Sequence, residues 1–197
     1  MFIKHEGLGN TSQSDLLTNH EGLGNTKYLQ SFLSVSDADK YLTVFQETFV
    51  LEKKEHECRL TGLYGDVKEY KYAHNVGTPV FWTQELLEIK NRVEKITNFV
   101  YNVCLINYYE NGKAKFNFHA DKEEIGNSTP IAVISLGAER KFYFRSQTKS
   151  DDKFSIILEH GSLVLIDSIA HENYLHSLPP DNSIKFPRMS LTFRFAR

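Results

Sequence analysis

Two polar residues, His119 and Asp121, stand two positions apart in the segment "FNFHADKEEIGNSTP" at 116–130. Residues i and i+2 of a strand face the same way, so both side chains can converge on one ion. With a second histidine they would form the two-His-one-carboxylate set that binds iron and leaves positions open for other ligands. The pair alone decides little, because a His-x-Asp arises by chance in many chains of this length.

Three downstream histidines could complete such a set: His160, His171 and His176. His160 precedes a glycine in an expected turn, whereas His171 and His176 both lie in the segment "SIAHENYLHSLPP". His176 is bracketed by leucines, which favours a side chain inserted into the fold. The spacing alone does not choose among the three.

The last apolar run, "RMSLTFRF" at 188–195, alternates polar and apolar side chains. One face of the predicted strand carries Arg188, Ser190, Thr192 and Arg194. Taken alone, such a face is typical of a solvent-exposed stripe. In an earlier run, however, Asn107 and Tyr109 continue an apolar face, which favours a lined pocket. An arginine is suited to hold a carboxylate there, because its planar fork donates two parallel hydrogen bonds.

Two helices are expected ahead of these strands. Ser36 and Asp39 have the form of a capping box, and apolar residues at helical spacing predict a helix over 37–48. A second helix is predicted over 83–98, with one apolar and one charged face. From residue 101 onward, short β-runs separated by Gly, Asn, Asp or Pro predict an antiparallel sandwich or barrel. These runs are "YNVCLINYY", "PIAVISLG", "KFYFR", "FSIIL", "SLVLID" and "MSLTFRF".

The composition is that of one folded domain. Of 197 residues, 41% are hydrophobic and 13% aromatic, enough for a sizeable core and favourable for β-structure. The net charge of −2 argues against a large sequence-independent nucleic-acid binder. Two cysteines outside any Cys-x-x-Cys pair argue against a disulfide framework. Without a signal-like or membrane-length apolar stretch, we expect an intracellular protein, cytoplasmic or nuclear, that is neither secreted nor membrane-bound.

The heptapeptide "HEGLGNT" occurs twice, at 5–11 and at 20–26. Two copies are too few for a stacked repeat array, so residues 1–26 are expected to form a mobile N-terminal extension. Residues 27–100 would then supply the helices and a lid, and residues 101–197 the β-core. We expect 27–197 to form one catalytic domain.

The order of these motifs resembles the AlkB family of Fe(II)- and 2-oxoglutarate-dependent oxygenases, in particular its nucleic-acid repair branch. The resemblance covers about residues 28–197. The segments that carry it are Asn107-Tyr108-Tyr109, "FHADKEE", "TPIAVISLGAERKFYFR", "YLHSLP" and "PRMSLTFR". Upstream, "RLTGLYGDVKEYKY" looks like the family's nucleotide-recognition lid. The resemblance implies a mainly β fold of the α+β type, a double-stranded β-helix or jelly-roll core supported by N-terminal helices.

The resemblance also implies roles for single residues. Fe(II) would be bound by His119, Asp121 and His176. The cosubstrate 2-oxoglutarate would be held by Asn107, Tyr109, Arg188, Ser190 and Arg194, with Ser190 standing where many relatives have Asn. The substrate would be contacted by Glu123, Tyr70, Tyr72 and Arg59: the carboxylate faces the damaged base, the tyrosines grip the strand and the arginine meets phosphate.

The implied activity is oxidative demethylation of 1-methyladenine and 3-methylcytosine in DNA or RNA, consuming O2 and 2-oxoglutarate and releasing formaldehyde, succinate and CO2. The expected partner is a single-stranded or locally opened nucleic acid, and the protein is expected to be a monomer. Two alternatives stay open. One is a hydroxylase of the same chemistry that acts on a protein, a lipid or a small molecule. The other is a catalytically silent binding module, which a complete triad and both arginines argue against.

Overall fold

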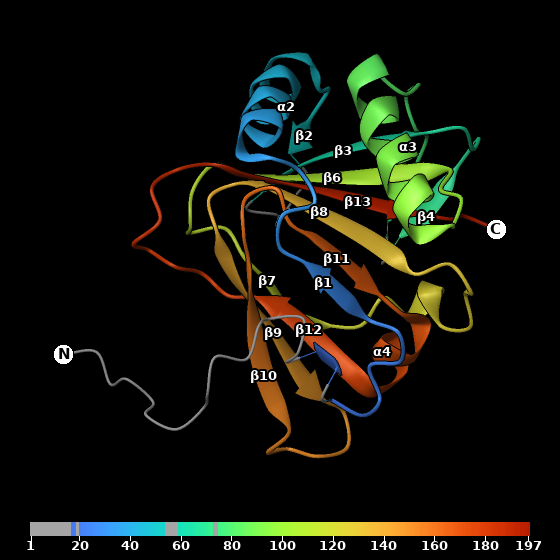
Figure 1. The fold of residues 1–197 in the computed structure, drawn as a ribbon, viewed down its shortest axis with the longest axis vertical. Helices are drawn as coiled ribbons and strands as arrows, with labels where there is room; N and C mark the ends of the chain where they lie inside the picture. Colours follow the sequence, from blue (N-terminus) through green and yellow to red (C-terminus); the bar gives the residue numbers. More distant parts are fainter. Residues whose placement is uncertain (1–16, 19, 54–58, 73–74) are drawn as a thin grey trace.

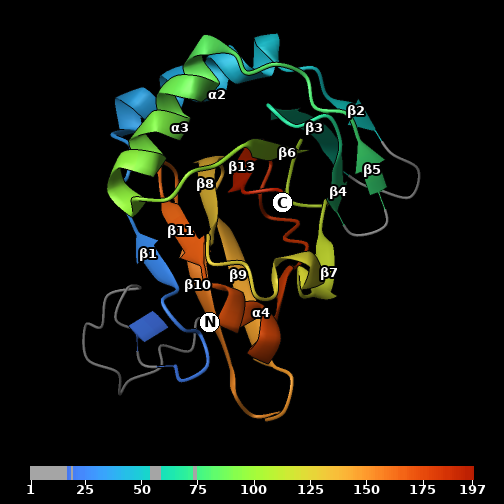
Figure 2. The ribbon, with the colours of Figure 1, turned by 90° about the vertical axis from the view of Figure 1, so that its right-hand side faces the viewer.

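The computed structural model describes residues 17–18, 20–53, 59–72 and 75–197. Two antiparallel sheets face each other, and the helices α2 (Val35–Thr48) and α3 (Gln84–Thr97) cover the outer face of the larger one (Figures 1 and 2). This arrangement confirms the expected mainly β, jelly-roll fold.

The larger sheet has seven strands and supplies the wall against which the helices pack. Its order is β1 (Lys27–Leu29), β11 (Leu163–Ile166), β8 (Ile131–Gly137), β13 (Arg188–Arg194), β6 (Val103–Tyr109), β3 (Leu60–Gly65) and β2 (Glu52–Lys53). The β-runs predicted from residue 101 onward are confirmed as strands, with ends that differ by one to two residues.

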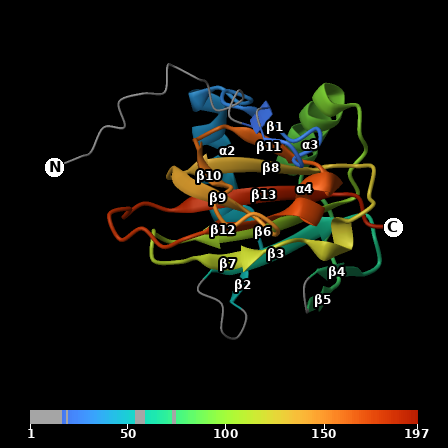
Figure 3. The same cartoon turned by 90° about the horizontal axis from the view of Figure 1, so that it is seen from below.

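The smaller sheet carries the motif with which the sequence analysis began. Its order is β10 (Lys153–Leu158), β9 (Arg140–Ser146), β12 (Tyr174–Leu178) and β7 (Phe116–His119). Seen from below, β7 and β12 run side by side beneath the larger sheet (Figure 3). A separate hairpin pairs β4 (Tyr70–Tyr72) with β5 (Asn75–Gly77). Its first strand ends the segment expected to be the lid, and its second strand lies just beyond that segment. Two short helices complete the fold, η1 (Lys122–Glu124) and α4 (Ser168–Asn173).

Both predicted helices are present, but the predicted cap of the first one is wrong. Helix α2 starts two residues earlier than expected, because the extended residue Ser34 accepts a hydrogen bond from the backbone N–H of Asp37. Ser36 instead lies inside the first turn of α2. On α3, Thr83 caps the start and the left-handed residue Asn98 the end, as the predicted limits of that helix require.

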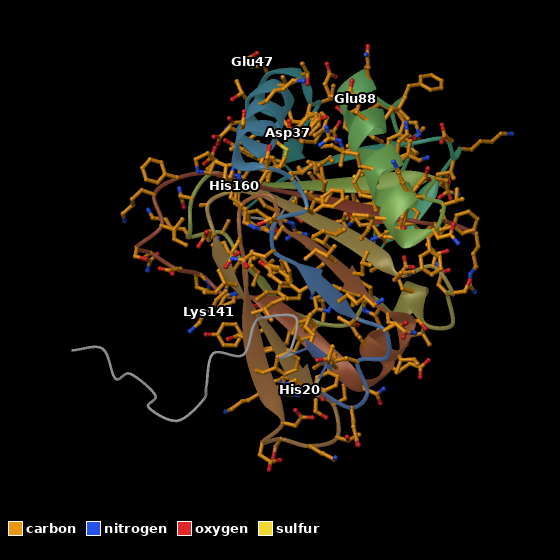
Figure 4. All side chains as sticks on the ribbon, viewed as in Figure 1. His20, Asp37, Glu47, Glu88, Lys141 and His160 are labelled. Carbon is orange, nitrogen blue, oxygen red and sulfur yellow. The ribbon has the colours of Figure 1, made fainter. Side chains whose placement is uncertain are left out.

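Two hydrogen bonds between side chains join the two helices. The Arg92 guanidinium donates to the Asp37 carboxylate at 2.9 Å, and the Tyr41 hydroxyl donates to Glu88 at 3.0 Å (Figure 4). Beneath them, a cluster of buried apolar residues packs the helices against the larger sheet. A second cluster fills part of the space between the two sheets. Strand β13 is therefore buried on both faces, one toward the helices and one toward the smaller sheet.

The second "HEGLGNT" copy is packed onto the β-core, which differs from the mobile extension expected for it. Leu23 is 1% exposed, and the His20 ring stacks on Phe154 with centroids 3.7 Å apart (Figure 4). Asn173 donates to the carbonyl of Gly22, and the backbone N–H of Asp167 donates to the Thr26 hydroxyl. The first copy, at 5–11, lies outside the described residues.

A candidate metal centre in the cavity between the sheets

His119, Asp121 and His176 lie together at one end of the space between the sheets. His119 ends β7, and His176 is its direct cross-strand partner on β12. Asp121 follows two residues after His119, at the start of η1. One possible ligand atom from each of the three lies within 4.8 Å of the others. The pairing of β7 with β12 thus brings His176 close to His119 and Asp121, which precede it by 55 or more positions.

Hydrogen bonds with neighbouring residues orient two of these three side chains, His119 and Asp121. The His119 Nδ1–H donates to the carbonyl of Asn117 at 2.9 Å, which turns Nε2 toward Asp121, 3.5 Å from Oδ1. On the other oxygen, Arg194 Nη2 donates to Asp121 Oδ2 at 2.9 Å. Burial alone would raise the pKa of the Asp121 carboxyl, but the Arg194 charge and the hydrogen bond with His119 hold that pKa well below its usual value. Asp121 is therefore a carboxylate ready to act as a ligand.

The buried histidines of the site are neutral. Burial lowers the pKa of His176 to about 3 and that of His171 to about 4, since a charged imidazole is poorly solvated there. For His119 burial also lowers the pKa, but hydrogen bonding and attraction to Asp121 outweigh it and raise that pKa overall. A neutral imidazole has the free lone pair that a metal ion needs.

The two other candidate histidines lie differently. The ring of His171 is 5.7 Å from that of His176, and neither of its nitrogens has a hydrogen-bond partner among the described residues. His160 is remote: its Nδ1 accepts from the backbone N–H of Gly137, and its Nε2 lies 3.2 Å from Asp39 on α2 (Figure 4). Within the described residues, the three-ligand cluster includes neither of them.

Arg188 lies in the same cavity, at the start of β13. It is 2% exposed, donates to the Ser135 hydroxyl at 2.9 Å, and its Nε has no partner among the described residues. Burial lowers the pKa of this guanidinium to about 10, and the nearby Tyr109 opposes that shift. A buried cation with an unused donor is suited to an anionic ligand, which would offset the cost of burying it.

Sequence reasoning missed a further buried arginine, Arg140, which lies beside Tyr109 as Arg188 does. The Tyr109 ring has Arg188 5.3 Å and Arg140 5.9 Å from its centre. Arg140 donates to the carbonyls of Ala114 at 2.9 Å and Pro179 at 2.6 Å. The alternation of β9 could have revealed it, because Arg140 shares its inward face with two phenylalanines.

A cavity of about 590 Å³ unites most of the predicted site residues. Those that line it are Arg59, Tyr72, Asn107, Tyr109, His119, Asp121, His176, Arg188, Ser190 and Arg194. Asn117 and Thr192 also line it. Apolar side chains from both sheets form the rest of the wall: Leu105, Phe116, Phe118, Ile131, Val133, Phe142, Leu158, Val164, Ile166 and Leu178. The polar face of β13 therefore lines a pocket and is not a solvent-exposed stripe.

The four residues predicted to contact the substrate differ in their position relative to the cavity. Arg59 donates from Nε to the Asn107 side-chain carbonyl at 2.8 Å, at the cavity wall. Tyr72 also lines the cavity, whereas Tyr70 does not and is 5% exposed. The side chain of Glu123 lies outside the described part of the structure.

Its neighbour Glu124 is buried and was not singled out from the sequence. Its side chain is 6% exposed, and its Oε1 lies 3.3 Å from Arg194 Nη1. The spacing of Glu124 from Asp121 could have indicated its position. Residues three apart in a 3₁₀ turn lie on the same side of that turn, as these two do.

Comparisons with known proteins agree with this geometry. A family model described as the 2OG-Fe(II) oxygenase superfamily matches residues 23–194. The chain is 32% identical over 146 residues to human alpha-ketoglutarate-dependent dioxygenase alkB homolog 3, covering 69% of this chain and 51% of that protein. It is 34% identical over 145 residues to human DNA oxidative demethylase ALKBH2, covering 69% and 56%. The chain thus spans about half the length of the curated relatives it matches.

Two solved structures share the fold. OsALKBH1 matches with a TM-score of 0.67 and 15% identity, over 87% of this chain and 96% of that one. A prolyl-4-hydroxylase from Pseudomonas putida matches with a TM-score of 0.58 and 15% identity, over 93% and 97%. At such identities the likeness concerns the fold alone. In the described part of the chain, no helix combines the length and apolar character needed to span a membrane.

Proposed function

The chain belongs to the 2OG-Fe(II) oxygenase superfamily, and its AlkB-homologue relatives confirm the resemblance found in the sequence. From this membership we propose that it is an AlkB-type dioxygenase that oxidatively removes N-alkyl groups, such as those of 1-methyladenine and 3-methylcytosine, from DNA or RNA. The observation that carries the proposal is one cavity that joins a His-Asp-His cluster to the two buried arginines of β13, Arg188 and Arg194. We further propose a single-stranded or locally opened nucleic acid as the partner and a monomer as the acting form.

The residues present fit the family's metal ion and cosubstrate. The donor set of two imidazole nitrogens and one carboxylate suits Fe(II) and leaves positions open on one side. His119, Asp121 and His176 would hold the ion. Arg188, with its unused Nε donor, would hold the distal carboxylate of 2-oxoglutarate, helped by the adjacent Tyr109.

When bound, the ion with 2-oxoglutarate and O2 supplies the oxidation: one oxygen atom enters the N-methyl C–H bond and the other enters succinate, with loss of CO2. The hydroxymethyl group then leaves the base nitrogen as formaldehyde, which restores the base. Arg194 balances the charge of Asp121 throughout, and the apolar wall keeps water from the reacting group.

The other residues predicted from the sequence complete the proposed site. Asn107 and Ser190 are cross-strand partners on β6 and β13, and we assign them to the cosubstrate side of the cavity. Tyr72 and Arg59, on the lid side, would meet the base and the phosphate of the substrate strand. Glu123 would accept a hydrogen bond from the exocyclic amino group, which favours cationic methylated bases over neutral ones. Tyr70 was expected to grip the strand, and that contact stays a prediction.

The test is anaerobic reconstitution with Fe(II) and 2-oxoglutarate, followed by oxygen and methylated oligonucleotides. We expect formaldehyde release that is lost in His119→Ala and in Arg188→Ala, and retained in Glu47→Gln, a change on the outer helix α2. Single-stranded DNA, single-stranded RNA and duplexes compared in parallel would define the preferred strand. Succinate production that persists in Asp121→Ala would overturn the metal assignment. Turnover with a peptide or small molecule but with no oligonucleotide would overturn the proposed substrate.

A further inference from the structure

Glu124 is a buried carboxylate to which the proposed chemistry assigns no role. Its Oε1 accepts from the Tyr70 hydroxyl and from Arg194 Nη1, both at 3.3 Å. Its Oε2 accepts from the Asn127 side-chain amide at 3.0 Å. Both carboxylate oxygens are thus fixed by donors from three separate segments of the chain.

Arg194 connects this carboxylate to the metal centre. Its Nη2 donates to Asp121 at 2.9 Å, while its Nη1 donates to Glu124 and to the Tyr70 hydroxyl at 3.3 Å each. Because the guanidinium is planar and rigid, the position of one edge fixes that of the other. The orientation of Asp121 therefore depends on what holds the far edge of Arg194.

Part of what holds it comes from the β4–β5 hairpin. Tyr70 lies on β4, and its ring stacks on that of Tyr72 with centroids 5.8 Å apart. Both rings are buried in a small apolar cluster with Val103 and Leu105 on β6. Tyr72 lines the cavity while Tyr70 reaches the Arg194 network behind it. The hairpin consequently contacts the site from two sides.

We propose that Glu124 is a positioning residue which, together with the Tyr70 hydroxyl and through Arg194, couples the β4–β5 hairpin to the metal-binding orientation of Asp121. The inference rests on the proposed function in one respect, since it takes His119, Asp121 and His176 as the ligands. Coupling of this kind is reciprocal. Metal binding steadies the hairpin, and loosening the hairpin weakens metal binding by the same factor.

The experiment measures binding and hairpin stability without relying on turnover. Mn(II) is titrated calorimetrically into the chelator-treated protein, and amide hydrogen exchange is followed at residues 70–72 and 75–77 with and without Mn(II). We expect Mn(II) to slow exchange in the wild type. We expect Glu124→Gln to bind Mn(II) about tenfold more weakly. Tyr70→Phe should show a smaller loss of the same kind, and in both variants Mn(II) should slow hairpin exchange less.

The matched control is Lys71→Ala, a change on the same strand at a side chain that is 77% exposed. It should leave the affinity for Mn(II) and the exchange response unchanged. Tyr70→Phe keeps the buried ring, so it gives an answer even where Glu124→Gln does not fold. Wild-type binding that Asp121→Ala abolishes, combined with unchanged affinity and exchange in both network variants, would overturn the coupling and leave the proposed function standing. A wild-type protein that binds no Mn(II) would instead overturn the metal assignment itself.

Discussion

His119 and His176 face each other as cross-strand partners on β7 and β12, with ring centroids 4.4 Å apart. Two candidate metal ligands that are distant in sequence are therefore held at a fixed separation by the pairing of β7 with β12. The third, Asp121, follows His119 by two residues and is oriented by Arg194. Because strand pairing and the Arg194 contact position these side chains, we expect metal binding to require little reorganisation.

A metal ion that binds the folded state should raise the melting temperature. At about 100 times its dissociation constant, Mn(II) should add roughly 2.7 kcal/mol to the free energy of unfolding. We expect this rise to vanish in His176→Ala. His160→Ala is the matched control, because that histidine lies away from the cluster. The rise is measured by differential scanning calorimetry with and without Mn(II), and its persistence in His176→Ala would contradict the assignment.

Replacing Arg188 by lysine should weaken 2-oxoglutarate binding while retaining the charge. The ammonium cannot reproduce the two-pronged donation of the guanidinium, so we expect KM for 2-oxoglutarate to rise about 10- to 100-fold. The kcat should change much less, because the contact is made equally before and during the reaction. Arg145→Lys on the exposed side of β9 is the control. A KM unchanged in Arg188→Lys would place the cosubstrate elsewhere.

Truncation of Leu23 should destabilise the protein through the packed second "HEGLGNT" copy. The side chain is 1% exposed, and Leu→Ala changes at such sites cost about 2–5 kcal/mol. Leu87→Ala on α3, where the side chain is 37% exposed, should cost clearly less. Urea unfolding gives both free energies. Equal values would mean that residues 20–26 contribute no packing in solution.

The thiol of Cys104 should be inert in the folded protein. Burial raises its pKa well above the usual value, so the reactive thiolate is scarce even at mildly alkaline pH. In a Cys58→Ser variant, iodoacetamide at pH 8 should leave the native protein unmodified and should modify it fully in urea. Mass spectrometry reads the outcome. Rapid native labelling would show that β6 opens to solvent.

Much of the fold was predictable because its signals are local. Alternating polar and apolar residues predicted β6 and β13, and apolar residues at helical spacing predicted α2 and α3. The start of α2 was misplaced because Ser34 and Ser36 are both followed by aspartate three residues later. Only the extended backbone of Ser34 decides which one caps the helix, and sequence does not encode that locally.

The residues of the candidate site could be predicted where a short sequence motif contains them. They could not be predicted where their role depends on tertiary contacts. His119 ends β7 and Asp121 follows two positions later, and Arg188 and Arg194 share one face of β13. Arg140 and Glu124 escaped notice because their roles depend on partners brought in by other segments, such as Pro179 and Tyr70. The packing of residues 20–26 likewise depends on partners from other segments, namely Phe154 of β10, Asn173 of α4 and Asp167, which caps α4.

Strand β13 packs against the helical layer with one face and lines the cavity with the other. All seven of its residues are buried. Substitutions should therefore be poorly tolerated at every position of this strand. They should impair either folding or activity, depending on the face that carries them. Changes at Met189, Leu191 and Phe193 should lower the yield of folded protein. Changes at Arg188, Ser190 and Arg194 should give folded but inactive protein. A saturation library of this one strand, sorted separately for abundance and for turnover, would display the two failures in alternation along the chain.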